Sequence, residues 1–293
     1  MRIFVTGGTG FIGSAIVREL IGAGHQVLGL ARSDAGAASL AAAAADVHRG
    51  SLEDPESLRN SAAAVDAVTH AGFNHDFSNG DAGDRQARDR DARRCAGGLS
   101  RPFIVTSGTA LATPGRVATE EDAANSTFPR KSEEASASAA ARGARLSVLR
   151  HPPSVHGNGD HGFVPLLINL ARENGVSAYV EDGLNRWPAV HRLDAARLYR
   201  LVLENGSAAP RYHAVADERV SFREIAQVIG QRLNIPVVSK SREEAAEHFG
   251  WFAHFAGLDC PASSTQTQQQ LGWRATQAAL IPNIDRPSYF ETN

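Results

Sequence analysis

The stretch VTGGTGFIG, residues Val5–Gly13, sets three glycines at the spacing GxxGxxG near the amino end of the 293-residue chain. A strand pattern precedes the glycines and a helix pattern follows them, so the stretch predicts a tight turn between a strand and a helix. Glycine suits this turn because a Cβ would keep the backbone away from a pyrophosphate, and because the last glycine lets the helix approach the strand. The helix N-terminus would offer free N–H groups and a partial positive charge to phosphates.

The stretch therefore predicts a dinucleotide-binding loop, with a purely structural turn as the alternative. Its place in a strand–turn–helix unit at the start of the chain favours the cofactor reading. The predicted cofactor contacts in this loop are Gly7, Gly10, Phe11, Ile12 and Gly13.

Short apolar runs alternate with helical stretches up to Arg150. The runs that predict strands are residues 3–6, 26–31, 46–48, 66–70, 103–107 and 146–149. Strands separated by helices predict right-handed βαβ units, and hence an α/β fold with a doubly wound parallel sheet of at least six strands. After Arg150 a loop rich in Pro, Gly and His, HPPSVHGNGDHG, introduces small helices and strands that predict a smaller lobe.

The end of the second predicted strand indicates which dinucleotide is bound. A site for NAD places Asp or Glu there, to bind the ribose 2′-hydroxyl group. Here the strand ends LGLARSD, so Arg32 and Ser33 take that place and Asp34 comes later. A guanidinium group can fork onto a 2′-phosphate, which a carboxylate would repel. We expect NADP(H) as the cofactor, the alternative being that Arg32 is simply a solvated loop residue.

Composition excludes several classes of protein. Hydrophobic residues make up 42% of the chain, and 30 Lys and Arg nearly balance 32 Asp and Glu, so no nucleic-acid partner is expected. The apolar runs are far shorter than the roughly 18–20 residues that span a bilayer, and the N-terminus lacks a signal-peptide pattern. The cysteines, Cys95 and Cys260, lie far apart and outside any CxxC pattern, which fits a reducing cytoplasm. We expect a cytoplasmic protein without a membrane partner.

The glycine stretch, the ARS at residues 31–33 and the RHPPSVHGNG at 150–159 together resemble the short-chain dehydrogenase/reductase superfamily, in its extended or atypical branch. The WPAVHRLDAARL at 187–198 resembles the stretch that follows in those proteins. The resemblance implies a Rossmann dinucleotide-binding domain at 1–155 and a substrate-binding lobe mainly at 156–293. A segment near 188–216 would return to the Rossmann domain, and the substrate would bind in the cleft between the two.

The resemblance also implies positions for further contacts. Ser51 and Leu52 would line the adenine, while Ala71 and Phe73 would run beside the nicotinamide ribose. Pro152, with Pro153, would lie by the nicotinamide.

The family's catalytic residues are matched only in part. A Ser or Thr after the fifth strand is present in TSGT, as Ser107 or Thr109. The Tyr-x-x-x-Lys motif is missing, because the alignment puts Pro129 at the tyrosine and Glu133 at the lysine. The chain therefore resembles an atypical subgroup that keeps the cofactor loop and lacks the usual phenolic acid.

Three local groups could replace that acid. Asn74, His75 and Asp76 follow the fourth strand, where ligands bind in such sheets, although Asn and Asp there could simply cap a helix. His156, Asp160 and His161 lie in the glycine-rich loop, where plain loop packing is the alternative.

The third group, Arg130 and Lys131, could supply charge near a carbonyl or could be solvated. The predicted catalytic residues are Ser107, Thr109, His75 and His156, because imidazole titrates near neutral pH. The predicted substrate contacts are Asn74, Asp76, His161, Trp187 and His191, the indole of Trp187 stacking on an aromatic substrate or packing within the lobe. No HxH or HExxH pattern occurs, so no metal is expected, although His156, Asp160 and His161 could hold a cation.

These patterns predict an NADP(H)-dependent oxidoreductase of the atypical short-chain type that acts on a small carbonyl, alcohol or imine. One alternative is a non-redox isomerase, epimerase or cyclase on the same fold, and another is a non-enzymatic protein that senses NADP. The expected partner is a small-molecule substrate, and a homodimer is possible. Fold-level resemblance does not choose among these functions.

Overall fold

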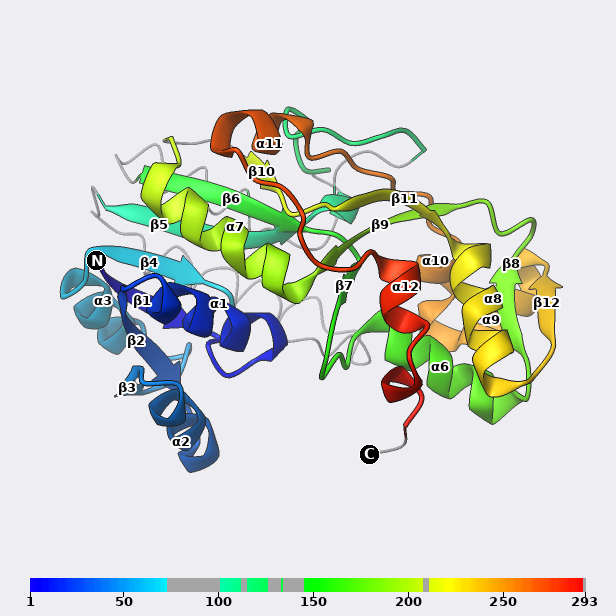
Figure 1. Ribbon diagram of the computed structural model, residues 1–293, viewed down its shortest axis with the longest axis horizontal. Coiled ribbons are helices and arrows are strands. Elements are labelled where there is room, and N and C mark those ends of the chain that lie inside the picture. The colour runs from blue at the N-terminus through cyan, green and yellow to red at the C-terminus, as the bar shows by residue number, and fades with distance from the viewer. Residues whose placement is uncertain (73–100, 112–114, 126–132, 134–144, 208–210, 292–293) are drawn as a thin grey trace.

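The computed structural model describes residues 1–72, 101–111, 115–125, 133, 145–207 and 211–291. Its largest element is a sheet of seven strands in the order β10-β6-β5-β4-β1-β2-β3, all paired in parallel (Figure 1). The strands are β1 (Arg2–Thr6), β2 (Gln26–Ala31), β3 (Asp46–Arg49), β4 (Ala67–His70), β5 (Pro102–Gly108), β6 (Arg145–His151) and β10 (Arg211–His213). The doubly wound parallel sheet predicted from the sequence is confirmed, and its strand order reverses between β1 and β4.

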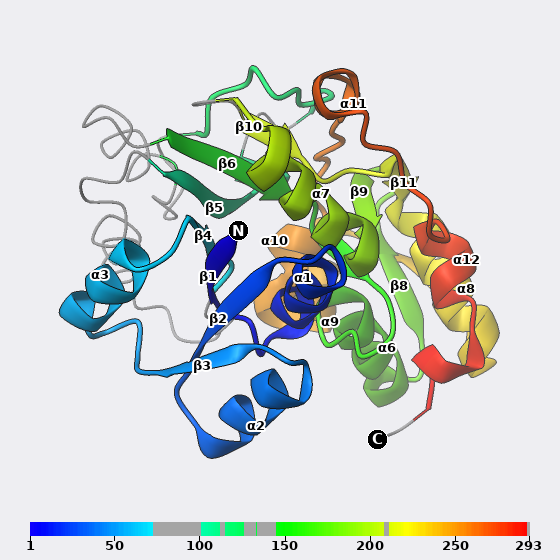
Figure 2. The same cartoon turned by 60° about the vertical axis from the view of Figure 1, so that its left-hand side comes forward.

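Side-chain alternation along the strands sends neighbouring residues to opposite faces of the sheet. Ile3 and Val5 pack into one core with α1 (Phe11–Gly22), α2 (Asp34–Ala42) and α7 (Arg192–Asn205), whereas Phe4 packs into another with α3 (Pro55–Ala63). Figure 2 shows α1 and α7 side by side on their face of the sheet, where they contact each other extensively. Both faces of the sheet are therefore covered.

Capping residues determine where two of the helices begin. The side chain of Asp54 caps α3 by accepting the backbone N–H of Ser57, as its position before Pro55 predicts. Ser221 forms a capping box with Glu224 at the start of α8 (Phe222–Leu233).

Beyond the large sheet, the chain builds a lobe around a second core. Its elements include α6 (Phe163–Asn174), α8, α9 (Arg242–Phe249), η2 (Gly250–Phe252), α10 (Ala253–Ala256) and α12 (Leu280–Ile284). A two-stranded parallel sheet of β8 (Ser177–Val180) and β12 (Val237–Lys240) lies at its outer end (Figure 1). The remaining short elements are α11 (Thr265–Leu271) and η3 (Pro287–Tyr289).

A three-stranded sheet was not predicted. Its strands are β7 (Ser154–His156), β9 (Arg186–His191) and β11 (Asp217–Ser221), with β9 in the centre. The HPPSVHGNG stretch, expected to be a loop, thus contains a strand. Pairing of β7 with β9 joins residues more than 30 positions apart, which local patterns do not reveal.

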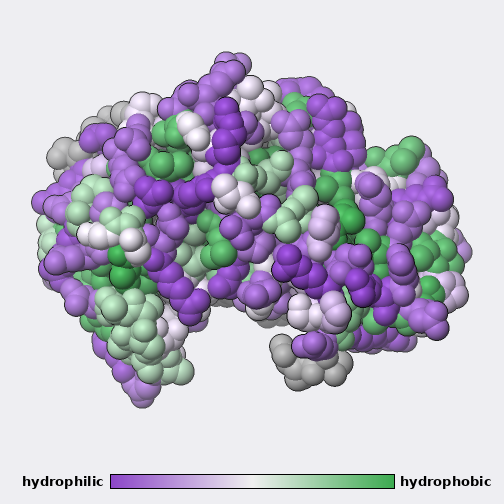
Figure 3. Space-filling view, viewed as in Figure 1, coloured by the Kyte–Doolittle hydropathy of each residue, from purple (hydrophilic) through white to green (hydrophobic). Residues whose placement is uncertain are grey.

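Figure 3 shows a mainly hydrophilic face that is notched along its lower edge between α2 and the C-terminal end of the chain. Across the described residues, no helix combines the length and apolar character needed to cross a membrane.

Candidate active site

The turns after β1 and β4 meet at the point where the strand order reverses. Gly7 has a φ of +72°, and a Cβ on it would lie 2.5 Å from the backbone of Gly72. A Cβ on Gly13 would lie 1.9 Å from the carbonyl oxygen of Gly7. Gly10 differs, since its Cβ would meet only that same oxygen, at 3.4 Å. The first and third glycines are therefore required for packing, while Gly10 faces open space that a ligand can approach.

The N-terminus of α1 gives this turn a partial positive charge. Gly10 is the N-cap in an extended conformation, and no side chain caps the helix. The N–H groups of Phe11, Ile12 and Gly13 have no carbonyl partner within an α-helix that starts here, and the helix dipole makes this end positive. The open space at Gly10, next to uncapped N–H groups, fits the pyrophosphate of a dinucleotide.

The residues after β2 also fit the phosphorylated cofactor. Arg32 is exposed and forms no ion pair with any residue that the structure describes. Ser33 caps α2, its Oγ accepting the N–H of Gly36 at 3.1 Å. Asp34, the first carboxylate after the strand, is paired with Arg49. The carboxylate of Asp34 is therefore paired with Arg49, whereas the guanidinium group of Arg32 has no ion-pair partner among the described residues.

Other predicted cofactor contacts gather at the same edge. Leu52 lies against the turn at Gly72, its Cδ1 3.2 Å from where a Cβ of that glycine would be. Ser51 and Ala71 directly precede Leu52 and Gly72 in the chain, and both are half-buried. Pro152 is buried directly after β6, and Phe73 lies outside the described residues.

A buried polar row crosses the ends of three neighbouring strands. The register pairs Ser107 of β5 with Arg150 of β6, and Arg150 with His213 of β10. All three side chains project from the sheet face opposite α7, because they share the alternation of Phe103 and Val105. The row therefore faces the side where residues 115–125 and Glu133 lie.

Glu133 contacts this row and forms an ion pair with Arg150. Its Oε1 accepts the hydroxyl hydrogen of Ser107 at 2.8 Å and the Nε–H of Arg150 at 2.7 Å. Its Oε2 accepts from Nη2 of Arg150 at 2.7 Å, and the side chain of Arg150 is fully buried. Burial opposes ionisation of Glu133, but the hydrogen bonds and charge of Arg150, with the hydrogen bond from Ser107, lower its pKa.

Two further donors of Arg150 are also engaged. Nη2 donates to the carbonyl of Asp122 at 2.8 Å, and Nη1 lies 3.3 Å from Nε2 of His213. Because Nδ1 of His213 lies 2.8 Å from the carbonyl of Ser263, which only accepts, we assign the proton to Nδ1. Burial and the neighbouring cation lower the pKa of His213 to about 4, so the ring is a neutral acceptor for Arg150.

The sequence did not predict that Glu133, Arg150 and His213 form one network. The alignment set Glu133 at the position of the missing lysine, and the structure places it on the predicted catalytic Ser107. An arginine within the apolar strand LSVLRH was the one available signal, since a buried cation needs a partner.

Thr109 differs from Ser107 in its hydrogen bonding. It opens η1 (Thr109–Leu111) and is 1% exposed, and its Oγ1 has no partner within the described part of the chain. The hydroxyl hydrogen of Ser107 is already donated to Glu133. Of these two buried hydroxyl groups, that of Thr109 is the one without a hydrogen-bond partner among the described residues.

A tyrosine lies close by, on the other face of the sheet. The hydroxyl group of Tyr199 is 2.6 Å from Oγ1 of Thr106 and 2.9 Å from Nε2 of His151. Thr106 precedes Ser107 in the strand and points to the opposite face. Tyr199 projects from α7 as a fully buried side chain and does not take the place of the missing phenolic acid.

The prediction of His156 as a proton donor is corrected. His156 ends β7 and is fully buried, with Nδ1 3.1 Å from Oδ1 of Asn283. Burial lowers the pKa of His156 to about 4, so the imidazolium form that would act as the acid is disfavoured near pH 7. The loop that follows, rather than this ring, reaches the glycine turn.

That loop is held against the start of α1. The exposed ring of His161 meets the ring of Phe11 edge-on, with 5.6 Å between centroids. Asp160 accepts the hydroxyl hydrogen of Tyr289 at 3.1 Å, and burial raises its pKa to about 6. His191 caps α7, since its Nδ1 accepts the N–H of Leu193. Of these residues, His161 lies nearest the cofactor turn.

The prediction of Trp187 as a stacking residue is also corrected. Its side chain is fully buried, with its ring 5.1 Å from that of Phe222 and 5.9 Å from that of Phe163. Its indole N–H donates to the carbonyl of Leu258 at 3.2 Å. Trp187 packs the lobe core, which was the alternative interpretation, because neighbouring rings cover it.

Several predicted site residues lie outside the described residues. They are Asn74, His75, Asp76, Pro129, Arg130 and Lys131. Among the residues that are described, no group of three or more His, Cys, Asp or Glu side chains could hold a metal ion.

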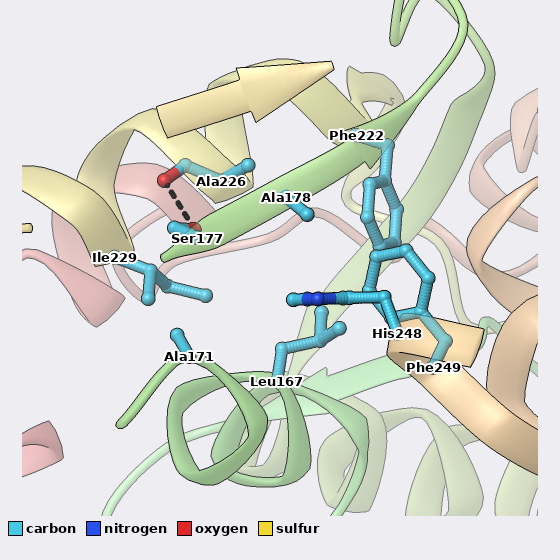
Figure 4. A pocket seen from close by; sticks show the side chains of 9 residues that line it. All are labelled: Leu167, Ala171, Ser177, Ala178, Phe222, Ala226, Ile229, His248 and Phe249. Carbon is cyan, nitrogen blue, oxygen red and sulfur yellow. Dashed lines mark hydrogen bonds between the residues drawn. The ribbon is translucent and has the colours of Figure 1, made fainter. Parts of the chain in front are cut away.

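A small cavity lies inside the lobe, away from these strand ends (Figure 4). Leu167, Ala178, Phe222 and Phe249 line it, and the hydroxyl group of Ser177 beside it donates to the carbonyl of Ala226 at 2.8 Å. Only about 10 Å³ of it is open to the centre of a water-sized sphere, so it has room for about one water molecule. The cavity is too small for a substrate.

Comparison with known proteins identifies the class. The model of the NAD dependent epimerase/dehydratase family matches residues 3–88. Protein C2A9.02 of Schizosaccharomyces pombe is 49% identical over 99% of this chain and 100% of its own length. The chain belongs to the same family as this protein, and its residues 3–88 match the NAD dependent epimerase/dehydratase family that the sequence resembles.

Two further proteins are similar to this chain, one in part of its sequence and one in its fold. The 2-alkyl-3-oxoalkanoate reductase of Stenotrophomonas maltophilia is 44% identical over 72 residues, which is 25% of this chain and 21% of that protein. The crystal structure of the dTDP-glucose 4,6-dehydratase DesIV from Streptomyces venezuelae, with NAD bound, superposes with a TM-score of 0.78. It covers 99% of this chain and 97% of its own at 22% identity, a likeness that shows the Rossmann-like fold.

Proposed function

We propose that this protein is an NADP(H)-dependent oxidoreductase of the atypical short-chain type, acting on a small carbonyl, alcohol or imine. The observation that carries the proposal is the turn at Gly10, open to a pyrophosphate, together with Arg32 after β2, which is exposed and has no ion-pair partner in the described part of the chain. We further propose that residues 1–155 bind the cofactor and that 156–293 mainly bind the substrate, with the segment near 188–216 returning to the first part. A cytoplasmic location and a homodimer remain predictions.

The substrate would be held at the carboxyl end of β5. When bound, the nicotinamide supplies or accepts a hydride at C4. Thr109 would donate its hydroxyl hydrogen to the substrate oxygen, because that hydroxyl group has no other described partner. Ser107, with its hydrogen on Glu133, would present lone pairs instead. His75 stays the predicted proton donor, and a water molecule is the alternative.

A non-redox isomerase, epimerase or cyclase is the second candidate. The observation that favours it is the replacement of the family's lysine by Glu133, which is held on Arg150 rather than left as a free cation. Mixing the protein with NADPH and a panel of small aldehydes, ketones and imines separates the two. Net oxidation of NADPH supports the oxidoreductase, and conversion of a compound without net oxidation supports the second candidate.

Cofactor choice should depend on Arg32. Calorimetric titration of the unmodified protein should give tighter binding of NADPH than of NADH. Arg32→Ala should remove most of that difference, because a charge-assisted contact of this kind contributes about 1.5–3 kcal/mol, or roughly 10- to 150-fold in affinity. Arg219→Ala, which removes an exposed arginine of the lobe, should leave the difference unchanged. Equal affinities for the two cofactors in the unmodified protein would rule out this assignment.

Turnover should depend on the hydroxyl group of Thr109. Thr109→Val keeps the shape and removes the donor, so kcat for NADPH oxidation should fall by about 10²–10³-fold, the usual effect of losing one donor to a developing oxyanion. NADPH affinity should stay within a factor of about two, since the cofactor turn is unchanged. Thr265→Val on the exposed start of α11 is the matched control, and steady-state kinetics is the measurement. Unchanged kcat in Thr109→Val would sink the role of this hydroxyl group.

A further inference from the structure

An arginine at the start of α7 lies on the first residue of α1. The guanidinium carbon of Arg192 is 4.9 Å from the centre of the Phe11 ring. Two turns further along the helices, Nε of Arg200 in α7 donates to Oε1 of Glu19 in α1 at 2.8 Å. The two helices, which lie side by side in Figure 2, therefore run in the same direction, and both begin beside the glycine turn.

Two glycines of the loop after β7 make room for this arginine. A Cβ on Gly157 would lie 3.2 Å from Cγ of Arg192, and a Cβ on Gly159 would lie 3.8 Å from its Nη1. Both glycines have positive φ angles, +137° and +80°, which L side chains rarely adopt. The GNG at residues 157–159 therefore lets the loop pack closely on Arg192 and restricts where its guanidinium group lies.

Arg192 lacks a counter-charge in the described part of the chain. Its side chain is half-buried, and it forms no ion pair with a described residue, so its guanidinium group rests on the ring of Phe11. Burial and the neighbouring cation of Arg18 lower the pKa of Arg192, which means that these surroundings disfavour its charged form. A bound anion would remove this electrostatic cost.

The carboxylates in this region already have other partners. Asp160 accepts the backbone N–H of Gly162 at 2.8 Å and the hydroxyl hydrogen of Tyr289 at 3.1 Å. Asp194, in the first turn of α7, pairs with Arg197 at 3.4 Å. The other titratable groups around the loop and the start of α7 are cations or imidazole rings, namely Arg18, Arg286, His161 and His191. The described residues thus leave an excess of positive charge beside Phe11.

We propose that the guanidinium group of Arg192 binds the diphosphate of the dinucleotide cofactor. This inference rests on the proposed function and adds a residue from the 156–293 part of the chain to the cofactor contacts. Phe11 links Arg192 to the phosphate position, because its backbone N–H has no carbonyl partner within α1 while its ring carries the guanidinium group. A guanidinium group suits this place, since its planar fork can stack on a ring and donate two hydrogen bonds to phosphate oxygens.

The test compares the affinities for NADPH and NADH by calorimetric titration. Arg192→Met keeps an apolar stem beside Gly157 and removes the charge, so both cofactors should bind more weakly by the same factor, roughly 10- to 100-fold. The factors should be equal because NADPH and NADH share the diphosphate and differ only at the 2′-phosphate. Adenosine 2′-phosphate, which has no diphosphate, should bind the wild type and Arg192→Met alike. Arg192→Gln, also neutral, should give the same losses and replaces Arg192→Met should that variant fail to fold.

Arg18→Met is the matched control. It removes an exposed arginine of α1 that lies near Arg192 and seven positions after Phe11. The affinity for either cofactor should change by less than about threefold, because a solvated charge at this distance is screened. Raising KCl from about 50 mM to about 500 mM should narrow the gap between the wild type and Arg192→Met, whereas a purely structural role of Arg192 would leave the gap unchanged.

The outcomes separate this inference from the proposed function. Unchanged binding of both cofactors in Arg192→Met overturns the inference and leaves the cofactor site standing. A loss confined to NADPH overturns it as well, since Arg192 would then meet the 2′-phosphate. Equal losses for NADPH and NADH, in a protein that does not prefer NADPH, support the inference and remove the assignment of NADP(H). If the wild type binds neither cofactor, both proposals are wrong.

Discussion

Glu133→Ala should lower the free energy of unfolding by about 3–5 kcal/mol, because it leaves the fully buried guanidinium group of Arg150 without its counter-charge. Ser107 loses its acceptor in the same variant, which adds to the loss. Urea unfolding followed by circular dichroism gives the free energy and, through an unchanged m-value, shows that the folded state is intact.

The cost should arise from the unpaired charge rather than from the pair itself. The double variant Glu133→Leu with Arg150→Met should lose less stability than Glu133→Ala alone, since an apolar pair of similar volume can replace a buried ion pair. Asp46→Ala, which breaks the exposed pair with Arg2, should change the stability by at most about 1 kcal/mol. A Glu133→Ala variant as stable as Asp46→Ala would contradict this account of the network.

The effect of Glu133 should also depend on pH. Since its folded-state pKa is lowered, its contribution to stability is fully present above the unfolded-state pKa of about 4.3 and is lost as the pH falls through the folded-state value. The difference between the wild type and Glu133→Ala should therefore be constant near neutral pH and should shrink in strong acid. If the stability difference between the wild type and Glu133→Ala grew on acidification, the pKa of Glu133 would be raised in the folded state rather than lowered, and this account would be wrong.

Gly13→Ala should abolish the cofactor site by displacing α1. Its Cβ would lie 1.9 Å from the carbonyl oxygen of Gly7, closer than any real contact, and that oxygen belongs to the backbone and cannot move alone. We expect a loss of roughly 2–4 kcal/mol in unfolding free energy, as for other overpacked core positions, and at least about 100-fold weaker NADPH binding. Thermal unfolding and calorimetric titration are the measurements.

Two neighbouring glycines provide matched controls. Gly10→Ala meets only one backbone oxygen at 3.4 Å, so its stability should stay near that of the wild type while its NADPH affinity falls. Gly22→Ala in the same helix meets nothing within 4 Å and should add about 0.5–1 kcal/mol of stability without affecting the cofactor. If Gly13→Ala binds NADPH as Gly22→Ala does, the turn is structural only.

The large sheet was predictable because its signals are local. The apolar runs, the glycine turn and the capping residues Asp54 and Ser221 each act within a few positions. The three-stranded sheet was missed because β7 has three residues and pairs with a strand that comes some 30 residues later. Local sequence patterns do not show which strand β7 pairs with.

The site shows the same division. Gly7 and Gly13 belong to a pattern that depends on adjacent residues, and the structure shows close backbone approaches that only glycine allows at both positions. The role of Arg32 in cofactor binding stays a prediction. His156 and Trp187 were misjudged because their roles depend on burial, which tertiary packing decides. Glu133 stood at the lysine position of the alignment, and its partners Ser107 and Arg150 become neighbours only through the pairing of β5 with β6.

The loop that touches the cofactor turn is fastened by the last part of the chain. Tyr289 bonds Gly157 and Asp160, and Asn283 bonds His156, while His161 of the same loop contacts Phe11. Asn283 and Tyr289 come 127 and 132 positions after their partners in the loop, His156 and Gly157. A growing polypeptide can therefore form the glycine turn early, but it can fasten the neighbouring loop only after this much later segment has left the ribosome.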